Sequence, residues 1–581
     1  MNIPLRRYWD LLSTYIQSQR GRFIFLTILL LTSILLQILN PQIMRYFIDT
    51  AISGAPGQSL ALAALAFIGL AICQQAIGVS ATYLGENVAW NATNALRADL
   101  AQHCLNLDMS FHNDRSPGEL IERIDGDVAE LSNFFSQLVI RVIGNVVLLI
   151  GVLIVLMVQE LWVGLIYTAF AVIALLVLNR VRGIAIPHSK ALRAAIADLT
   201  GFLEERLAGT EDIRSSGAVD FVMNGLYRLQ YRILGHQRKA WMMNLFVGFT
   251  GGWLLLVGTI IAIISGFILF NSGAITIGTA YLLIYYINLL GRPIRELTQQ
   301  TENIQNIGAV TERLAELRKI TTRTVDGPGA DIPKGALGLA FDDVTFRYAD
   351  GEPVLKQITF DLQPGKVMGL LGRTGSGKTS LARLVFRLYD PVTGEIQIGG
   401  VNVRQPMLKE LRQRVALVTQ DVQLFQATVR DNLTFFNDRI PDERILQVIT
   451  DLELTDWFKG LPAGLDTRLE TGGRSLSAGE GQLLAMARVF LRDPGLVILD
   501  EASSRLDPAT EQRIERAIDR LLLGRTALII AHRLGTVDRA DDIMILEDGR
   551  VVEAGERKAL IDQPDSRFAR LLSTGLEGVL A

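Results

Sequence analysis

The sequence predicts a chain of two parts: an α-helical membrane domain of six spans with long cytoplasmic helical extensions, and then an α/β domain. Charge-free apolar runs of span length recur through the first 300 residues. From about Gly335 onward, strand and helix patterns are mixed, and β-rich runs such as Val367–Leu371 are present. We therefore place a transmembrane domain at 1–325, a linker at 326–335 and an α/β domain at 336–581.

The composition agrees with this division and excludes several other classes of protein. The chain is 49% apolar and 20% charged, which is the average of two unlike populations of sequence. A disordered chain is excluded by the apolar content, and the 52 glycines show no collagen-like period of three. The formal net charge of −3 gives no reason to expect nucleic acid as a partner.

Six stretches have the length and composition of membrane spans. A bilayer core of about 30 Å requires roughly 20 helical residues. The run Ala240–Gly291 contains no acid, lysine, arginine or histidine and is too long for one span, so we divide it at Asn271-Ser272-Gly273. The predicted spans are 23–44, 60–85, 138–159, 161–180, 245–270 and 274–292.

Orientation follows from the positions of lysine and arginine. Basic residues precede the first span and are frequent in 86–141 and 180–239, whereas the intervening short loops contain almost none. The positive-inside rule then places both termini in the cytoplasm. We expect an integral, multi-pass protein in the lipid bilayer of a bacterial inner (plasma) membrane, with an interfacial amphipathic helix at 4–16.

The two long basic segments contain few turn signals. They could be soluble helical hairpins between spans, or the spans could continue as helices beyond the bilayer. We favour the second interpretation, because helical spacing of apolar residues persists through 91–107 and 192–207. Turns are expected at Arg115-Ser116-Pro117-Gly118 and at Gly209-Thr210.

A phosphate-binding loop begins the chemistry of the second half. The apolar strand Val367–Leu371 leads into Gly372-Arg373-Thr374-Gly375-Ser376-Gly377-Lys378-Thr379, and a helical pattern begins at Ser380. The pattern Gly-x-x-x-x-Gly-Lys-Thr between a strand and a helix predicts ATP binding. Glycines let backbone N–H groups converge on phosphate oxygens at the helix N-terminus. Lys378 would reach the β- and γ-phosphates, and the Thr379 hydroxyl would bind Mg²⁺.

Two carboxylates end a second apolar strand, Leu496–Leu499. We expect Asp500 to hold Mg²⁺ through water, and Glu501 to orient and deprotonate the attacking water. A pair of acids at a strand end is common in α/β proteins. Its combination with the upstream loop is what indicates an ATPase.

A third element, Leu476-Ser477-Ala478-Gly479-Glu480, precedes the helical stretch Gln482–Leu491. Here the chain resembles the ATP-binding-cassette (ABC) superfamily, whose signature is similar to Leu-Ser-Gly-Gly-Gln. Ser477 is a good N-cap residue, and Gly479 permits close approach of the backbone. The resemblance implies that this serine and glycine contact the γ-phosphate of ATP bound to the opposite subunit, and hence that the protein acts as a dimer.

Four further matches occur in the order that the family shows. Tyr348 resembles the aromatic residue that stacks on adenine, and Gln420 resembles the glutamine that senses Mg²⁺ and links to the membrane domain. Asp507 resembles the aspartate loop between the two nucleotide sites, and His532 resembles the histidine that hydrogen-bonds the γ-phosphate. Together with the phosphate-binding loop and the acid pair, the resemblance implies that Glu501, His532, Lys378 and Gln420 are the catalytic residues.

The membrane half extends the resemblance to a half-size exporter of this superfamily. The sequence Phe111–Leu120 resembles the one before the first coupling helix, which would lie near Asp125–Asp127. The coupling regions are thus expected near 111–127 and 209–216. Three departures from the family pattern are present: Ala478 and Glu480 in the signature, Arg505 in the aspartate loop, and Glu470-Thr-Gly-Gly-Arg474, which lacks the usual acid.

The resulting hypothesis is ATP-driven export by alternating access, carried out by a dimer of half-transporters. The partner is an identical or a different half-transporter, and an ATP-gated channel or regulatory subunit is the alternative function. Polar residues in the spans either form interhelical hydrogen bonds or contact the substrate: Gln37, Gln42, Gln74, Gln75, Asn145, Tyr281, Tyr285 and Tyr286. Span centres without charge favour an amphipathic, lipid-like, drug-like or peptide substrate over small ions.

Overall fold

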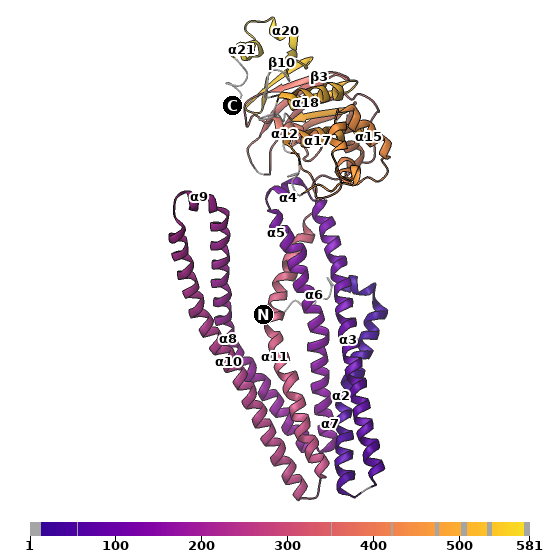
Figure 1. Ribbon diagram of the computed structural model, residues 1–581, viewed down its shortest axis with the longest axis vertical. Coiled ribbons are helices and arrows are strands. Elements are labelled where there is room, and N and C mark those ends of the chain that lie inside the picture. The colour runs from indigo at the N-terminus through magenta and orange to yellow at the C-terminus, as the bar shows by residue number, and fades with distance from the viewer. Residues whose placement is uncertain are drawn as a thin grey trace. The chain divides into compact units, whose positions relative to one another are not determined.

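The structure is a computed structural model that describes residues 13–54, 56–349, 351–419, 422–470, 476–500, 508–531 and 537–574 (Figure 1). The chain divides into two compact units. The helical unit contains the residues up to Leu105 together with Pro117–Ile320, and the α/β unit contains Asn106–Ser116 and the residues from Thr321 onward. Most of the predicted interfacial helix at 4–16 lies outside the described residues, but residues 13–17 are helical.

Long helices build the helical unit. In chain order its elements are α2 (Arg20–Ile52), α3 (Gly57–Leu105), α5 (Pro117–Ile121), the π-helical segment η1 (Glu122–Asp127), α6 (Val128–Gln137), the π-helical segment η2 (Leu138–Ile143), α7 (Gly144–Gln159), α8 (Leu161–Ala208), α9 (Thr210–Ser215), α10 (Val219–Asn271) and α11 (Ile277–Lys319). α2 packs against α3, and α8 packs against α10. α11 contacts α2, α7, α8 and α10 and so joins the two pairs (Figure 1).

Five stretches of helix among the described residues are long and apolar enough to cross a membrane: α2, α3, Arg141–Gln159, α8 and α10. They contain the predicted spans 23–44, 60–85, 161–180 and 245–270 and most of 138–159. The sixth predicted span, 274–292, lies at the start of α11, which is not among the five. This stretch ends at Arg292, and Arg295 follows it, so the sixth span stays a prediction.

The spans continue as helices, and separate soluble hairpins are absent from the described part of the helical unit. α3 has 49 residues, α8 has 48 and α10 has 53. At 1.5 Å per residue, a helix of that last length is about 80 Å long, more than twice a bilayer core of about 30 Å. The turn predicted at Gly209-Thr210 is present, because α8 ends at Ala208 and α9 begins at Thr210.

The α/β unit contains two sheets surrounded by helices. A four-stranded sheet has the order β2-β1-β4-β5, and a six-stranded sheet has the order β10-β9-β3-β8-β7-β6. The strands are β1 (Leu339–Phe346), β2 (Leu355–Leu362), β3 (Val367–Leu371), β4 (Thr393–Ile398), β5 (Val401–Asn402), β6 (Val415–Val418), β7 (Leu496–Asp500), β8 (Thr526–Ile530), β9 (Asp542–Glu547) and β10 (Arg550–Glu556). The helices are α4 (Met109–Asn113), α12 (Lys378–Val385), α13 (Leu408–Arg414), α14 (Val429–Thr434), α15 (Asp442–Asp451), α16 (Thr455–Lys459), the 3-10 turn η3 (Gly464–Asp466), α17 (Ala478–Arg492), α18 (Pro508–Leu522), α20 (Arg557–Ile561) and α21 (Arg567–Thr574).

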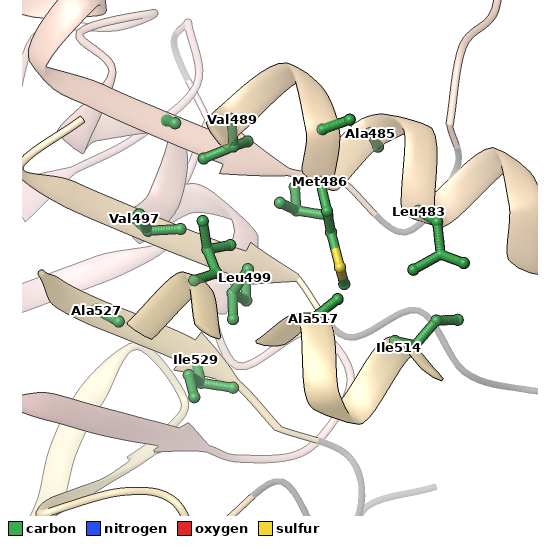
Figure 2. Packing of buried hydrophobic residues seen from close by; sticks show 14 of the residues in the cluster. Leu483, Ala485, Met486, Val489, Val497, Leu499, Ile514, Ala517, Ala527 and Ile529 are labelled. Carbon is green, nitrogen blue, oxygen red and sulfur yellow. The ribbon is translucent and has the colours of Figure 1, made fainter. Parts of the chain in front are cut away.

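Both faces of the six-stranded sheet are covered, which explains why its central strands are apolar throughout. On one face, Val497 and Leu499 of β7 lie in a buried cluster with Leu483 and Met486 of α17 and Ala517 of α18 (Figure 2). The alternate β7 residues, Leu496 and Ile498, point to the other face, where they share a cluster with Leu381 and Leu384 of α12. α12 and α17 are thereby fixed on opposite faces of one sheet.

Candidate functional site: a nucleotide-binding edge of the parallel sheet

The candidate site is formed at the carboxyl edge of the parallel strands β3, β8 and β7. Leu370 of β3 pairs with Ile530 of β8, and Ile530 pairs in turn with Asp500 of β7. The loop Gly372–Gly377 follows β3 immediately, so this loop and the Asp500 carboxylate leave the sheet at the same level. Ligands of open parallel sheets bind at this edge.

The backbone of this loop requires glycine at two of its positions. Gly372 has a φ of 152°, and a Cβ there would lie 2.2 Å from the carbonyl oxygen of Leu546. Gly377 has a φ of 108°, and its Cβ would lie 2.7 Å from a methyl carbon of Leu355. Side chains would block this tight path of the chain. Arg373, Thr374 and Gly375 at the tip of the loop are exposed.

The side chains within the loop fit a phosphate group. Lys378 is buried, and its Nζ donates to the carbonyl oxygens of Gly372 at 2.5 Å and Arg373 at 3.0 Å. The Ser376 side chain is also buried, and its Oγ has no hydrogen-bond partner among the described residues. A buried hydroxyl without a partner, beside a buried ammonium group, is matched by an anionic ligand that accepts hydrogen bonds.

Lys378 and Asp500 interact electrostatically across the carboxyl edge. Burial lowers the pKa of Lys378, and the negative charge of Asp500 acts in the opposite direction. Thr379, in the first turn of α12, is exposed and available to a ligand. Thr379 and Asp500 supply the hydroxyl and carboxylate oxygens that Mg²⁺ prefers. Of the predicted residues, Gln420, Glu501, Asp507 and His532 lie outside the described residues.

Tyr348, the predicted base-stacking residue, lies just after β1. Its hydroxyl is 2.9 Å from the Oγ of Ser380 and accepts a hydrogen bond from Arg383 at 3.2 Å, and both partners belong to α12. Hydrogen bonds thus connect Tyr348 with α12, the helix that begins at the phosphate-binding loop. Sequence reasoning did not identify Arg383. Its position on the helix that begins at Lys378 was the available signal.

The signature segment begins α17 with a capping box. The Ser477 Oγ accepts from the backbone N–H of Glu480 at 3.3 Å, and the Glu480 carboxylate accepts from the backbone N–H of Ser477 at 2.7 Å. Leu476 packs against the buried cluster, Ala478 is the first residue of the helix, and Gly479 is buried. Glutamate, which departs from the usual glutamine, is therefore explained locally, because either side chain completes a capping box. The described residues contain no hydrogen bond between this segment and the phosphate-binding loop of the same chain.

Arg488 is a second residue that sequence reasoning did not identify. It lies on α17 and donates to the carbonyl oxygens of Asn432 at 2.8 Å and Gln423 at 3.0 Å. Its guanidinium also lies 4.6 Å from the ring centroid of Phe435. Burial lowers its pKa to about 10. Arg488 thus connects the signature helix with the segment that follows Gln420.

Replacing Arg488 by methionine is expected to destabilise the α/β unit by about 2–4 kcal/mol, because the carbonyl group of buried Asn432 and the partly buried carbonyl group of Gln423 lose their donor. The thermal transition of the α/β unit in the detergent-solubilised protein should fall by roughly 5–10 °C, measured by scanning calorimetry. Arg516→Met is the matched control. Arg516 forms an exposed ion pair with Glu453 at 2.8 Å, so its loss should have little effect on stability. Equal shifts for the two variants would contradict the structural role of Arg488.

Each half of the chain matches a family of known proteins. The family description "ABC transporter transmembrane region" matches residues 23–294, and "ABC transporter" matches residues 355–504. An uncharacterized ABC transporter ATP-binding protein of Bacillus subtilis, YknV, is 30% identical over 570 residues, covering 95% of this chain and 92% of that protein. An ATP-dependent lipid A-core flippase of Photobacterium profundum is 31% identical over 522 residues, covering 87% of this chain and 86% of that protein.

The fold is shared with a solved structure of a bacterial Atm1-family ABC exporter with ATP bound. The TM-score is 0.78 at 23% identity, with 96% of this chain and 98% of that chain covered. The phosphate-binding loop, the carboxylate at the end of β7 and the signature helix lie within residues 355–504, which match the ABC transporter family description. The chain therefore belongs to the ATP-binding-cassette transporter family, as an integral membrane protein of half-transporter architecture that couples an ATPase domain to export.

Proposed function

We propose that the protein is an ATP-driven exporter of an amphipathic substrate and works by alternating access as a dimer of half-transporters. The observation that carries this proposal is the presence, in one chain, of a phosphate-binding loop with buried Lys378 and of a cavity among apolar helices. The cavity belongs to the helical unit and has a volume of about 890 Å³. That volume is ample for a drug-sized or lipid-like molecule.

In the nucleotide site, Lys378 and the backbone of Gly372–Gly377 bind the β- and γ-phosphates of ATP, and Tyr348 stacks on the base. Ser376 in this loop and Ser380 in α12 belong to the same nucleotide site. Thr379, Asp500 and Gln420 would hold Mg²⁺, which supplies charge neutralisation between the phosphate groups. Glu501 deprotonates the attacking water, and His532 hydrogen-bonds the γ-phosphate. The positions of Lys378, Thr379 and Asp500 at one sheet edge support these roles.

The second half of each nucleotide site comes from the partner chain. Ser477 and Gly479 at the start of α17 contact the γ-phosphate of ATP held by the other subunit, and Asp507 lies between the two sites. In support, α12 and α17 cover opposite faces of the sheet, and the hydrogen bonds of Ser477 are with Glu480. The partner is a second copy or a different half-transporter, in a bacterial inner membrane with both termini in the cytoplasm.

The cavity favours a substrate with a polar end and an apolar body. Its polar lining includes Gln37, Gln75, Gln137, Asn145, Arg292 and Glu296, and its apolar lining includes Leu30, Ile34 and Leu148. Other polar residues of the spans form hydrogen bonds between helices. Gln42 donates to the Tyr286 hydroxyl at 2.9 Å, and that hydroxyl donates to the Ile38 carbonyl at 2.9 Å. The names of the lipid A-core flippases point to a lipid-like substrate.

Vectorial transport by the purified protein tests this proposal. Reconstituted into sealed liposomes, the protein should move a fluorescent lipid or an amphipathic dye against its gradient when Mg²⁺ and ATP are added to the side of the α/β unit. An ATP-gated channel would instead give flux that stops when the two concentrations become equal. Flux of that kind, with no accumulation for any compound that stimulates the ATPase, would contradict the exporter and favour the channel.

A further inference from the structure

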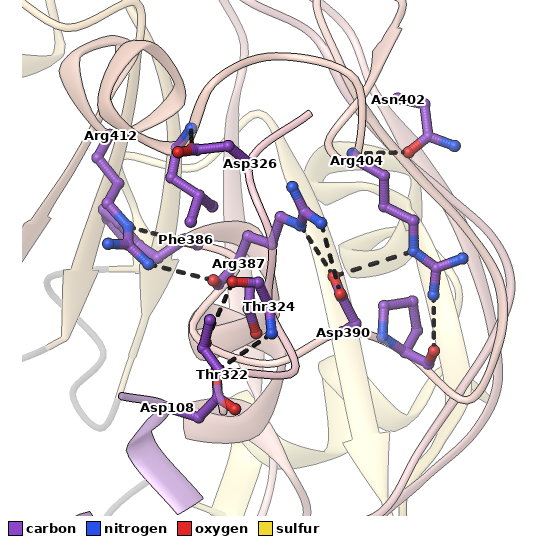
Figure 3. Close-up of polar contacts among 12 residues, drawn as sticks. Asp108, Thr322, Thr324, Asp326, Phe386, Arg387, Asp390, Asn402, Arg404 and Arg412 are labelled. Atoms are coloured by element: carbon purple, nitrogen blue, oxygen red, sulfur yellow. Dashed lines mark hydrogen bonds and ion pairs between the residues drawn. The ribbon is translucent and has the colours of Figure 1, made fainter. Parts of the chain in front are cut away.

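The segment between α3 and α5 belongs to the α/β unit, although the helices on either side of it belong to the helical unit. It spans Asn106–Ser116 and contains α4. At its start, the Asp108 carboxylate accepts hydrogen bonds from the Thr322 hydroxyl at 2.5 Å and from the backbone N–H of Thr324 at 3.2 Å (Figure 3). Burial would raise the pKa of Asp108, but these hydrogen bonds and one from the N–H of Arg323 outweigh it and lower the pKa.

This segment precedes, in the sequence, the position at which the first coupling helix was expected. The coupling helix was expected near Asp125–Asp127, but those residues form the end of η1 in the helical unit. The helix of the α/β unit that overlaps the predicted coupling region 111–127 is α4, at Met109–Asn113. Asn106–Ser116 is therefore the part of the chain between the second and third predicted spans that belongs to the α/β unit.

The end of α4 contacts a buried tyrosine. The Asn113 side-chain amide donates a hydrogen bond to the Tyr389 hydroxyl at 2.9 Å. Tyr389 follows α12 and is 8% exposed. Burial raises the pKa of Tyr389, and the neighbouring Tyr348 acts in the same direction, so the hydroxyl is neutral at physiological pH.

Tyr389 in turn contacts the predicted base-stacking residue. The rings of Tyr389 and Tyr348 are perpendicular, with centroids 5.1 Å apart. Both rings also contact Phe346 of β1, at centroid distances of 5.5 Å and 4.8 Å. Perpendicular aromatic pairs have a preferred geometry, so the orientation of one ring constrains the other.

We propose that Tyr389 is a positioning residue for nucleotide binding, and that its hydrogen bond with Asn113 transmits occupancy of the base site to the α4 segment. The proposal rests on the proposed role of Tyr348 in stacking on the base. A base that stacks on Tyr348 fixes that ring, the perpendicular Tyr389 ring is held with it, and the Tyr389 hydroxyl holds the end of α4. Loss of the hydroxyl would break this chain of contacts while leaving the three-ring cluster in place.

Steady-state kinetics of the full-length protein give the first test. Tyr389→Phe should raise KM for ATP by about 3- to 10-fold and leave kcat within about 2-fold, because one hydrogen bond is lost outside the reacting atoms. Asn113→Leu should have the same effect, and the double variant should be no worse than either single variant. Asn113→Asp should restore the parent value, because the Tyr389 hydroxyl can donate to a carboxylate. Additive single effects, or no rescue by Asn113→Asp, would overturn the proposal.

Hydrogen exchange of the backbone amides at 106–116 gives a readout that a merely structural role would not change. Addition of Mg²⁺ and the non-hydrolysable analogue AMP-PNP should slow exchange at 109–113 in the parent. At saturating nucleotide, this effect should be lost in Tyr389→Phe. Tyr231→Phe, at an exposed position of α10, is the matched control and should behave as the parent. Unchanged protection in Tyr389→Phe would refute the proposal, whereas failure of the parent to bind the nucleotide would refute the proposed function.

Discussion

Replacing Lys378 by alanine is expected to weaken ATP binding by roughly 10- to 100-fold and to reduce hydrolysis by at least about 100-fold. The Lys378 ammonium is the buried positive charge of the loop, and two carbonyl oxygens hold it in place at 2.5 Å and 3.0 Å. Its removal leaves the phosphates without that charge in a site where charge interactions are little screened. Equilibrium titration with a fluorescent ATP analogue and measurement of phosphate release give the two quantities.

Lys366→Ala is the matched control for Lys378→Ala. Lys366 lies just before the other end of β3, is about half exposed and forms an ion pair with Asp542 at 3.7 Å. Both variants lose one lysine near the same strand, so a general effect of charge or of β3 stability would appear in both. Nucleotide affinity that is normal in Lys378→Ala would rule out the proposed phosphate contact. A loss in both variants would indicate a defect in folding.

The phosphate-binding loop and the helix cap at Ser477 were predictable because their signals are local in the sequence. β3 is buried on both faces and therefore reads as an uninterrupted apolar run. The glycines that follow are required by positive φ angles and close contacts at Gly372 and Gly377. Ser477 was predicted to cap a helix, and it does so with Glu480 three residues later. In each case, the interacting groups lie within a few residues of one another.

The contacts that could not be predicted join residues far apart in the chain. Asn113 and Tyr389 are 276 positions apart, and Arg488 reaches carbonyl groups 56 and 65 positions away. No periodicity of either segment encodes such a pair. The two π-helical segments, η1 and η2, were missed for a different reason. A π turn adds one residue to a helix without removing its apolar face, so the helical pattern in the sequence still holds.

Glu501→Gln is expected to reduce hydrolysis by about 10²- to 10⁴-fold, while ATP binding is retained. Glu501 directly follows Asp500, the last residue of β7. Asp500 pairs with Ile530 of β8, which in turn pairs with Leu370 near the end of β3, so the acid pair lies beside the start of the phosphate-binding loop. Glutamine keeps the size and polarity of the side chain but cannot accept a proton from water. In this variant, the rate of phosphate release should therefore fall while the affinity for nucleotide stays normal. In Lys378→Ala, both the rate and the affinity should fall.

The same variant also tests the dimer. If ATP closes two α/β units on each other and hydrolysis reopens them, Glu501→Gln should accumulate in the closed state when Mg²⁺ and ATP are present. Spin labels can be placed at the exposed position Glu443 in both protomers. With Mg²⁺ and ATP, the distance between the two labels should then take a single value that is not seen with ADP. Glu515→Gln, on the exposed side of α18, is the control and should continue to cycle. Normal turnover in Glu501→Gln would show that another group activates the water, and loss of hydrolysis without closure would show that ATP binding alone does not bring the units together.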